Sequence, residues 1–181
     1  MALKSTIHKV SLDVADLDRN YYHRHVLTVA KHPSETDERM MLRLVAFARH
    51  ADSRLAFGAG LCDSTEPDLW CRDLTGNVDC WIDLGQPDER RIAKACGRAA
   101  QVVIYAYGGQ ATRQWWQQLE GRLGRFRNLS VFAVAPDAVR SLGSLAERSM
   151  DLYATVNDDT VLLVSRDASI EIAVEYLLRR P

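Results

Sequence analysis

Apolar and polar positions alternate near both ends of the chain, as in strands that bury one face. Alternation over residues 3–14, and again over the Tyr-, Val- and Thr-rich residues 21–31, predicts a long N-terminal hairpin. Turn-forming residues at 16–20 separate the two segments. Three antiparallel strands are predicted near the other end, at 150–156, 160–165 and 169–175.

A helix is predicted directly after the N-terminal hairpin, from Ser34 to about Asp52. Ser34 is a favourable N-cap, and acidic residues in the first turn suit the helix dipole. Glu38 lies one turn into the helix, where it is either a surface acid favoured by the dipole or an acid directed at the central hairpin. One broad face is apolar at helical spacing, through Met40, Met41, Leu44, Val45, Phe47 and Ala48.

The centre of the chain alternates between strands and helices. Two alternating runs, 68–73 and 78–84, flank Leu74-Thr75-Gly76-Asn77 and predict a second hairpin. The segments after it are predicted as a helix at 88–99, a strand at 101–107, a helix at 111–123, a strand at 129–135 and a short helix at 136–147. This order requires a right-handed crossover, so the last two strands should pair in parallel. We therefore predict one α/β domain over residues 1–181, with a mixed sheet and flanking helices.

The amino-acid composition indicates which kinds of partner and which cellular compartment to expect. With 47% apolar residues, 26% charged residues and a net charge of −1, the chain has no global positive field to draw it to nucleic acid or an anionic membrane. Such a partner would have to meet a local patch. No apolar run of 18 residues occurs, which predicts neither membrane spanning nor export. The four cysteines lack metal-site spacing and predict buried free thiols of a cytoplasmic protein.

Two short groupings allow more than one interpretation. His23 and His25 share a strand face, but a metal ion needs more convergent ligands, which favours a structural or surface role. Trp115 and Trp116 lie beside several arginines, so they could stack on a nucleic-acid strand. Adjacent helical residues point about 100° apart, however, so at least one tryptophan is predicted to belong to the core.

Several stretches resemble one known family over nearly the whole chain. They are MALKSTIHK, HPSETDERMMLRLVAFA, EPDLW, WIDLGQPDERRIAKAC, WWQQ and NLSVF. By these stretches the chain is identified as a member of the bacterial YaeQ family. The resemblance implies a variant of the PD-(D/E)XK nuclease-like fold, with the N-terminal hairpin and C-terminal strands added, and a loose link to transcription elongation. In that superfamily an acid on the first helix, a Pro-Asp and an acid-x-Lys converge on magnesium.

Strand geometry indicates which acids of the central hairpin could bind one metal ion together. Asp79 and Asp83 share a face, but four residues at about 3.3 Å separate them by roughly 13 Å, too far to share one ion unless a bulge intervenes. If the hairpin turns about Thr75-Gly76, Asp68 lies opposite Asp83 with Cβ atoms roughly 5 Å apart. The same register pairs Asp79 with Arg72, an ordinary ion pair. A shift of register would reverse the ranking.

The lysine of the motif is missing, because Gly85 occupies its position. A glycine cannot polarise water, so the motif as written is broken. Lys94 lies about two turns into the following helix and could reach back toward Asp83, a variation that the resemblance permits. Alternatively, Lys94 belongs to a basic face with Arg91 and Arg98, either solvated or in contact with phosphate.

The leading hypothesis is a magnesium-dependent, nuclease-like phosphodiesterase acting on DNA or RNA. Asp68 and Asp83 would bind Mg²⁺, Lys94 would serve the attacking water, and Glu38 would complete the acidic cluster. The alternative is a catalytically inactive binding or regulatory module that keeps the nuclease fold, motivated by Gly85 and the lack of net positive charge. A third hypothesis is an enzyme for small phosphate or nucleotide substrates.

Overall fold

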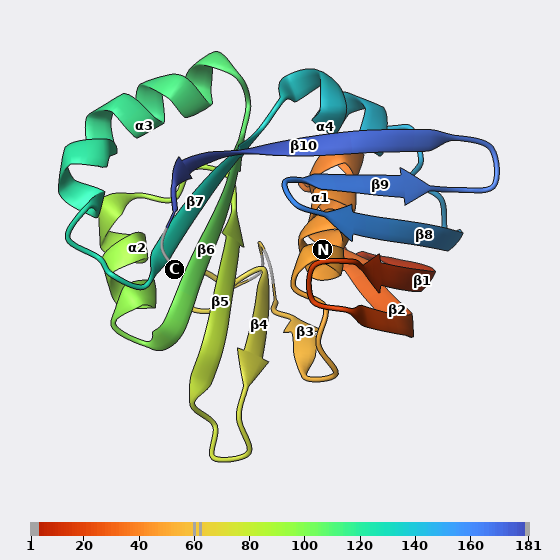
Figure 1. Ribbon diagram of the computed structural model, residues 1–181, viewed down its shortest axis with the longest axis horizontal. Coiled ribbons are helices and arrows are strands. Elements are labelled where there is room, and N and C mark those ends of the chain that lie inside the picture. The colour runs from red at the N-terminus through yellow and green to blue at the C-terminus, as the bar shows by residue number, and fades with distance from the viewer. Residues whose placement is uncertain (1–3, 60, 62, 180–181) are drawn as a thin grey trace. The chain divides into compact units, whose positions relative to one another are not determined.

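The computed structural model describes residues 4–59, 61 and 63–179 (Figure 1). Contacts between Cα atoms divide the chain into two compact units, each built from two separate segments. Unit 1 combines the residues up to Ala51 with Asp137–Ala173, and unit 2 combines Asp52–Pro136 with the residues from Val174 onward. The single domain expected over residues 1–181 stays a prediction.

Unit 1 contains strands from both ends of the chain. They are β1 (Thr6–Asp16), β2 (Tyr21–Lys31), β8 (Ser149–Asn157), β9 (Thr160–Val164) and the first part of β10 (Ser169–Leu178), in the order β2-β1-β8-β9-β10. Antiparallel pairing of β1 with β2 confirms the N-terminal hairpin, and antiparallel pairing along β8, β9 and β10 confirms the three C-terminal strands. The sequence did not predict that β1 and β8 pair in parallel and so join the two ends.

Helix α1 (Asp37–Arg49) packs against β1, β8 and β9, and every residue from Met40 to Ala48 is buried. Its N-cap is Thr36, whose side chain accepts a hydrogen bond from the N–H of Arg39. The expectation that Ser34 caps this helix is therefore wrong. The Oγ of Ser34 lies 2.6 Å from Nδ1 of His32, and this bond holds it away from the helix. The remaining helix of unit 1 is α4 (Pro136–Gly143).

His50, which ends α1, is expected to make stability depend on pH. Burial, followed by the charges of Arg49 and Arg19, lowers the pKa of His50 to about 3. In the unfolded chain this pKa is about 6.5, so between the two values the unfolded state binds a proton that the folded state excludes. The contribution of neutral, buried His50 to the free energy of unfolding is therefore fully present above pH 6.5, and it is lost progressively as the pH falls from 6.5 toward 3. Urea unfolding between pH 7 and pH 4 measures this loss, and His50→Gln should remove part of it.

Unit 2 contains a mixed sheet, in agreement with the predicted α/β class. Its strands are β3 (Leu55–Phe57), β4 (Leu69–Arg72), β5 (Val78–Leu84), β6 (Ala99–Tyr107), β7 (Leu129–Val134) and the last part of β10. The pairs β5–β6 and β6–β7 are parallel, as the helix–strand order requires, whereas β3–β4, β4–β5 and β7–β10 are antiparallel. The short β3 was not among the strands predicted from the sequence.

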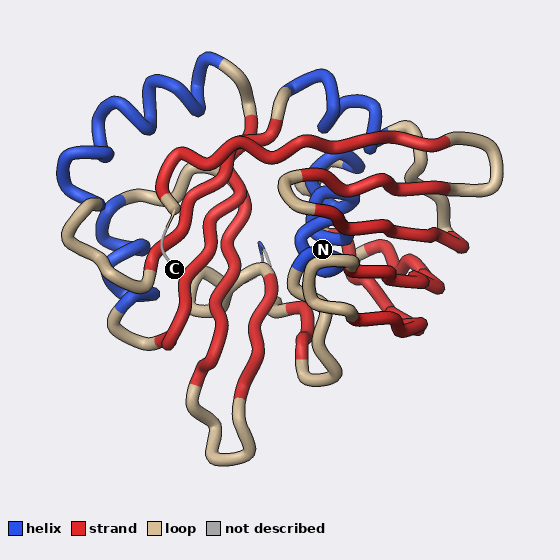
Figure 2. Tube along the Cα trace, viewed as in Figure 1, coloured by secondary structure: helices blue, strands red, loops and turns tan. Residues whose placement is uncertain are grey.

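Two helices, α2 (Glu89–Cys96) and α3 (Gln110–Leu123), cover one side of the parallel strands of unit 2 (Figure 2). Their apolar faces meet the strands in a common core. Its buried members are Trp81, Ile92, Ala95, Ala99, Val102, Ile104, Leu119, Leu123, Leu129 and Val131. The three free cysteines among the described residues are Cys71, Cys80 and Cys96, and burial raises the pKa of each thiol to about 11 or 12. None of the described helices is long and apolar enough to cross a membrane.

The hairpin β4–β5 follows the predicted register over its central pairs, such as Trp70 with Trp81. A bulge after Cys71 then shifts the pairing, so that Arg72 faces Val78. The expected ion pair between Arg72 and Asp79 is therefore wrong. Instead, Arg54 binds Asp79 at 2.6 Å, and Arg72 lies 4.0 Å from the centre of the Trp70 ring.

Candidate functional site around Asp83 and Arg91

The end of β5 carries a buried carboxylate paired with an arginine. Asp83 is only 3% exposed. Its Oδ2 accepts a hydrogen bond from Nε of Arg91 at 2.7 Å, and its Oδ1 accepts one from Nη2 at 2.8 Å. Two parallel bonds of this kind are the strongest arrangement between a guanidinium and a carboxylate. Asp83 therefore already has a cation bound to it.

Arg91 also binds the segment that precedes β4. Its Nη1 donates to the carbonyl oxygen of Ser64 at 2.6 Å, and Nη2 donates to that of Glu66 at 2.9 Å. The position of Arg91 follows from the start of α2, where the carboxylate of Asp88 caps the helix by accepting the N–H of Arg91. One side chain thus links α2, β5 and the chain before β4.

Asp68 lies at the same end of the hairpin, as the predicted register requires. It is 4% exposed and precedes β4 directly. Its Oδ2 accepts the N–H of Leu84 at 2.8 Å, and its own N–H donates to the carbonyl of Ile82. The structure therefore brings both predicted acids of the hairpin to the last residues of β5.

Lys94 lies on the exposed side of α2. Its charge contributes, after hydrogen bonds from Thr65, to lowering the pKa of Asp63. The side chain of α2 that contacts Asp83 is Arg91. The role expected for Lys94 in activating water stays a prediction.

Glu38 belongs to unit 1, whereas the other three predicted site residues belong to unit 2. It is half-buried in the first turn of α1, and its side chain lies against Gly143 of α4. A Cβ atom at position 143 would be 2.7 Å from Cγ of Glu38, so a glycine allows this close packing. The role of Glu38 in an acidic cluster stays a prediction.

The backbone explains the glycine at position 85, where the resemblance implies a lysine. Gly85 has a φ of 101°, a conformation that residues with a side chain rarely adopt, and its N–H donates to the carbonyl of Tyr105. A lysine at this position would be strained. Gln86 is a structural turn residue, because its side-chain amide donates to Thr112 at 3.0 Å and to the carbonyl of Tyr107.

These contacts fit a guanidinium better than magnesium. Both carboxylate oxygens of Asp83 are bonded to Arg91, so a divalent ion beside them would face a fixed positive charge at short range. Within residues 4–59, 61 and 63–179, no group of three or more His, Cys, Asp or Glu side chains is arranged to hold a metal ion. With Arg91 in this position, Asp68 and Asp83 do not fit the predicted Mg²⁺.

Exposed cations are concentrated on α2 and α3 and in the turns that follow them. Residues 86–128 contain eight basic and three acidic residues, a charge of +5, while the other 15 basic and 21 acidic residues give −6. The exposed cations are Arg90, Lys94, Arg98, Arg113, Arg122, Arg125 and Arg127. Glu89 of α2 accepts hydrogen bonds from both Arg122 and Arg125, at 3.1 and 3.0 Å. We call these seven side chains the cationic face.

The adjacent tryptophans are part of α3. Trp115 and Trp116 are both half-buried and pack against the core of unit 2. Nε1 of Trp115 donates to the carbonyl of Pro87 at 2.8 Å. Packing of both rings against the core agrees with the expectation of at least one core tryptophan, and stacking on a nucleic-acid strand stays a prediction.

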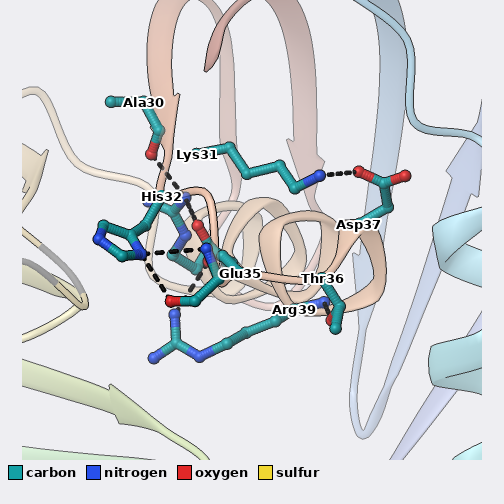
Figure 3. Close-up of polar contacts among 9 residues, drawn as sticks. Ala30, Lys31, His32, Glu35, Thr36, Asp37 and Arg39 are labelled. Carbon is teal, nitrogen blue, oxygen red and sulfur yellow. Dashed lines mark hydrogen bonds and ion pairs between the residues drawn. The ribbon is translucent and has the colours of Figure 1, made fainter. Parts of the chain in front are cut away.

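A second buried ion network lies in unit 1, at the start of α1 (Figure 3). Glu35 accepts hydrogen bonds from Arg39 at 2.9 Å and from Arg43 at 2.7 Å, and Arg43 also donates to the carbonyl of Ala30. The side chains of Glu35 and Arg43 are each 2% exposed. Sequence reasoning missed this network, because Arg43 lies within the apolar face of α1 and Glu35 precedes the helix.

The fold and the site together define a mixed-sheet α/β protein with a buried aspartate–arginine pair beside a cationic helical face. The family model described as YaeQ protein matches residues 1–174, and the chain belongs to this family. The uncharacterized YaeQ proteins of Escherichia coli (strain K12) and Salmonella typhi are each 46% identical to it over 172 residues, 95% of this chain and of theirs.

Two solved structures have the same fold. The YaeQ protein from Xanthomonas axonopodis pv. citri gives a TM-score of 0.94 at 46% identity, over 98% of this chain and 99% of that one. The YaeQ protein from Pseudomonas syringae gives a TM-score of 0.93 at 34% identity, over 97% of each chain. These similarities confirm the family predicted from the sequence.

Proposed function

We propose that this chain is a catalytically inactive module of PD-(D/E)XK-like ancestry that binds the phosphate backbone of nucleic acid. The observation that carries the proposal is a row of three exposed cations, Arg90 and Lys94 one turn apart on α2 and Arg98 just after the end of this helix. Like charges four residues apart on a helix repel by about 0.2–0.5 kcal/mol per pair. A polyanion across the row would replace this repulsion with attraction.

The end of α3 extends the same surface. Glu89 can neutralise only one of the two arginines that it binds, Arg122 and Arg125, so this junction keeps a net positive charge. Because the neighbouring tryptophans are half-buried against the core, we expect the contacts to be made mainly to phosphate rather than by stacking on bases. We therefore expect binding that depends strongly on salt and weakly on sequence.

A second candidate is the magnesium-dependent phosphodiesterase. It is favoured by one observation, the burial of Asp68 and Asp83 at the same end of the hairpin. It requires Arg91 to leave Asp83 during the reaction. Turnover of labelled DNA or RNA with Mg²⁺ or Mn²⁺ that disappears in Asp83→Asn would favour this candidate over the inactive module.

Fluorescence anisotropy with labelled single- and double-stranded DNA and RNA tests the binding proposal. For duplex DNA the logarithm of the association constant should fall linearly with the logarithm of salt concentration, with a slope of about −0.9 for each phosphate contacted. The double variant Arg90→Ala/Arg98→Ala should bind more weakly and lose up to about two units of this slope.

Arg166→Ala is the matched control, because Arg166 is also an exposed arginine but lies in unit 1. It should leave affinity and slope unchanged. Absence of binding to every probe at about 50 mM salt, where phosphate contacts are strong, would contradict the proposal. Equal losses in the Arg166 variant and in the double variant would also contradict it.

A further inference from the structure

We infer that Arg91 is the resident cation of the acidic site, in the place where a nuclease-like fold would hold a divalent ion. Removal of the guanidinium should turn the oxygen atoms that surround it into a site for Ca²⁺ or Mn²⁺. The inference does not depend on nucleic-acid binding, because its test contains no nucleic acid.

The first support is the set of atoms around the guanidinium. Four oxygen atoms accept hydrogen bonds from it at 2.6–2.9 Å. They are the two carboxylate oxygens of Asp83 and the carbonyl oxygens of Ser64 and Glu66. Carboxylate and carbonyl oxygens are also the ligands that hard divalent cations take in proteins. The surroundings of this guanidinium are therefore chemically those of a cation site.

The second support is the balance of charge and burial. An ionised carboxylate as buried as Asp83 needs a cation beside it, and Arg91 supplies one from the first turn of α2. With this charge in place, a divalent ion would be repelled from the same oxygens. The chain can thus form the site without any metal.

The third support is the path from solvent to Asp83 that opens when the side chain of Arg91 is shortened. Arg91 itself is 27% exposed, so its guanidinium reaches from the surface to the buried carboxylate. Alanine at position 91 would remove the guanidinium and open this path from solvent to the carboxylate oxygens of Asp83. Ca²⁺ accepts six to eight oxygens in flexible geometry, whereas Mg²⁺ demands near-ideal octahedral geometry, so we expect the vacated site to prefer Ca²⁺ and Mn²⁺ over Mg²⁺.

Calorimetric titration with Ca²⁺, Mn²⁺ and Mg²⁺, combined with thermal unfolding, tests the inference on the full chain. The native protein should show no saturable binding. Arg91→Ala and the neutral variant Arg91→Gln should each bind Ca²⁺ or Mn²⁺, with a rise in Tm of about 5–10 °C at a hundredfold excess over Kd. Arg91→Lys, which keeps the positive charge, and Arg91→Ala/Asp83→Asn, which lacks the carboxylate, should show neither effect.

Arg54→Ala is the matched control. Arg54 binds the exposed acids Asp79 and Asp52 in the same unit, so its removal also frees two carboxylates but no buried site. It should gain no saturable binding. Gain of equal affinity in this variant would overturn the assignment of the site to Asp83.

Two further results would overturn the inference. One is saturable binding of a divalent ion by the native protein that is lost in Asp83→Asn, because Arg91 would then share the site with a metal. The other is soluble Arg91→Ala and Arg91→Gln that bind no divalent ion. If both variants aggregate, refolding from urea with and without millimolar Ca²⁺ decides: higher soluble recovery with Ca²⁺ supports the inference, and equal recovery overturns it.

Discussion

Replacing Arg91 with alanine is expected to lower the free energy of unfolding by about 3–5 kcal/mol in the presence of a chelator, because it leaves a buried carboxylate without its cation. Removing the other partner of the pair, by Asp83→Ala, should lower the free energy of unfolding by less. The arginine that remains is 27% exposed and can turn its charge toward water, whereas Asp83 at 3% exposure cannot. Urea unfolding of both variants measures this asymmetry.

The exposed pair of Arg54 and Asp79 provides the comparison. Its two side chains are 47% and 42% exposed, at the same 2.6–2.7 Å separation as the buried pair. Surface pairs of this kind contribute little to stability. Arg54→Ala should therefore leave the unfolding midpoint nearly unchanged. Losses for Arg91→Ala no larger than those for Arg54→Ala would show that the buried Asp83 does not depend on Arg91 for stability.

Glu35→Ala is expected to have an effect of similar size in unit 1, about 3–5 kcal/mol, because Glu35 is the carboxylate that Arg39 and Arg43 share. Arg43 is as buried as Glu35 and cannot move its charge into water. Glu35→Gln keeps the shape and one acceptor but removes the charge, so it should fall between the native protein and Glu35→Ala. Urea unfolding at neutral pH gives the order of the three.

A surface acid of the same unit is the control for Glu35. Asp151 lies 3.9 Å from Arg24, and the two side chains are 79% and 62% exposed. Asp151→Ala should leave the midpoint of unfolding unchanged within error. A loss for Glu35→Ala that is as small as that for Asp151→Ala would mean that the arginines are neutralised without Glu35.

Local patterns predicted the elements of this fold well. Alternation predicted both strands of the N-terminal hairpin, and helix–strand order predicted the parallel pairs β5–β6 and β6–β7. Both kinds of pattern depend on residues close together in the chain. The parallel pairing of β1 with β8 joins segments about 140 residues apart, from Lys9 to Ser149, and no local signal reports such a pairing.

The candidate site was predicted in part. The hairpin register placed Asp68 at the same end as Asp83. The structure agrees, because the N–H of Asp68 donates to the carbonyl of Ile82 and its carboxylate accepts the N–H of Leu84. Sequence reasoning chose Lys94 as the residue of α2 that reaches Asp83 and gave Arg91 to a basic face. The signal that could have found Arg91 is its place three residues after the N-cap Asp88, at the end of the helix nearest β5.

Two departures from the predicted pattern arise from the backbone. The bulge after Cys71 moves Asp79 away from Arg72, and bulges cannot be read from alternation when both neighbours remain strand-like. The left-handed conformation of Gly85 explains a glycine where the motif has lysine. Glycine at that position is therefore a requirement of the chain's path.

The pairing of β1 with β8 can form only late in the synthesis of the chain. At about 5–20 residues per second, a ribosome would make Ser149 roughly 7–28 s after its partner Lys9. Until then, the apolar side of α1 lacks the strand β8 on which it packs in the finished protein. The nascent chain should therefore be a client for chaperones that shield apolar helices, and it should be most prone to aggregation when translation stalls between α1 and β8.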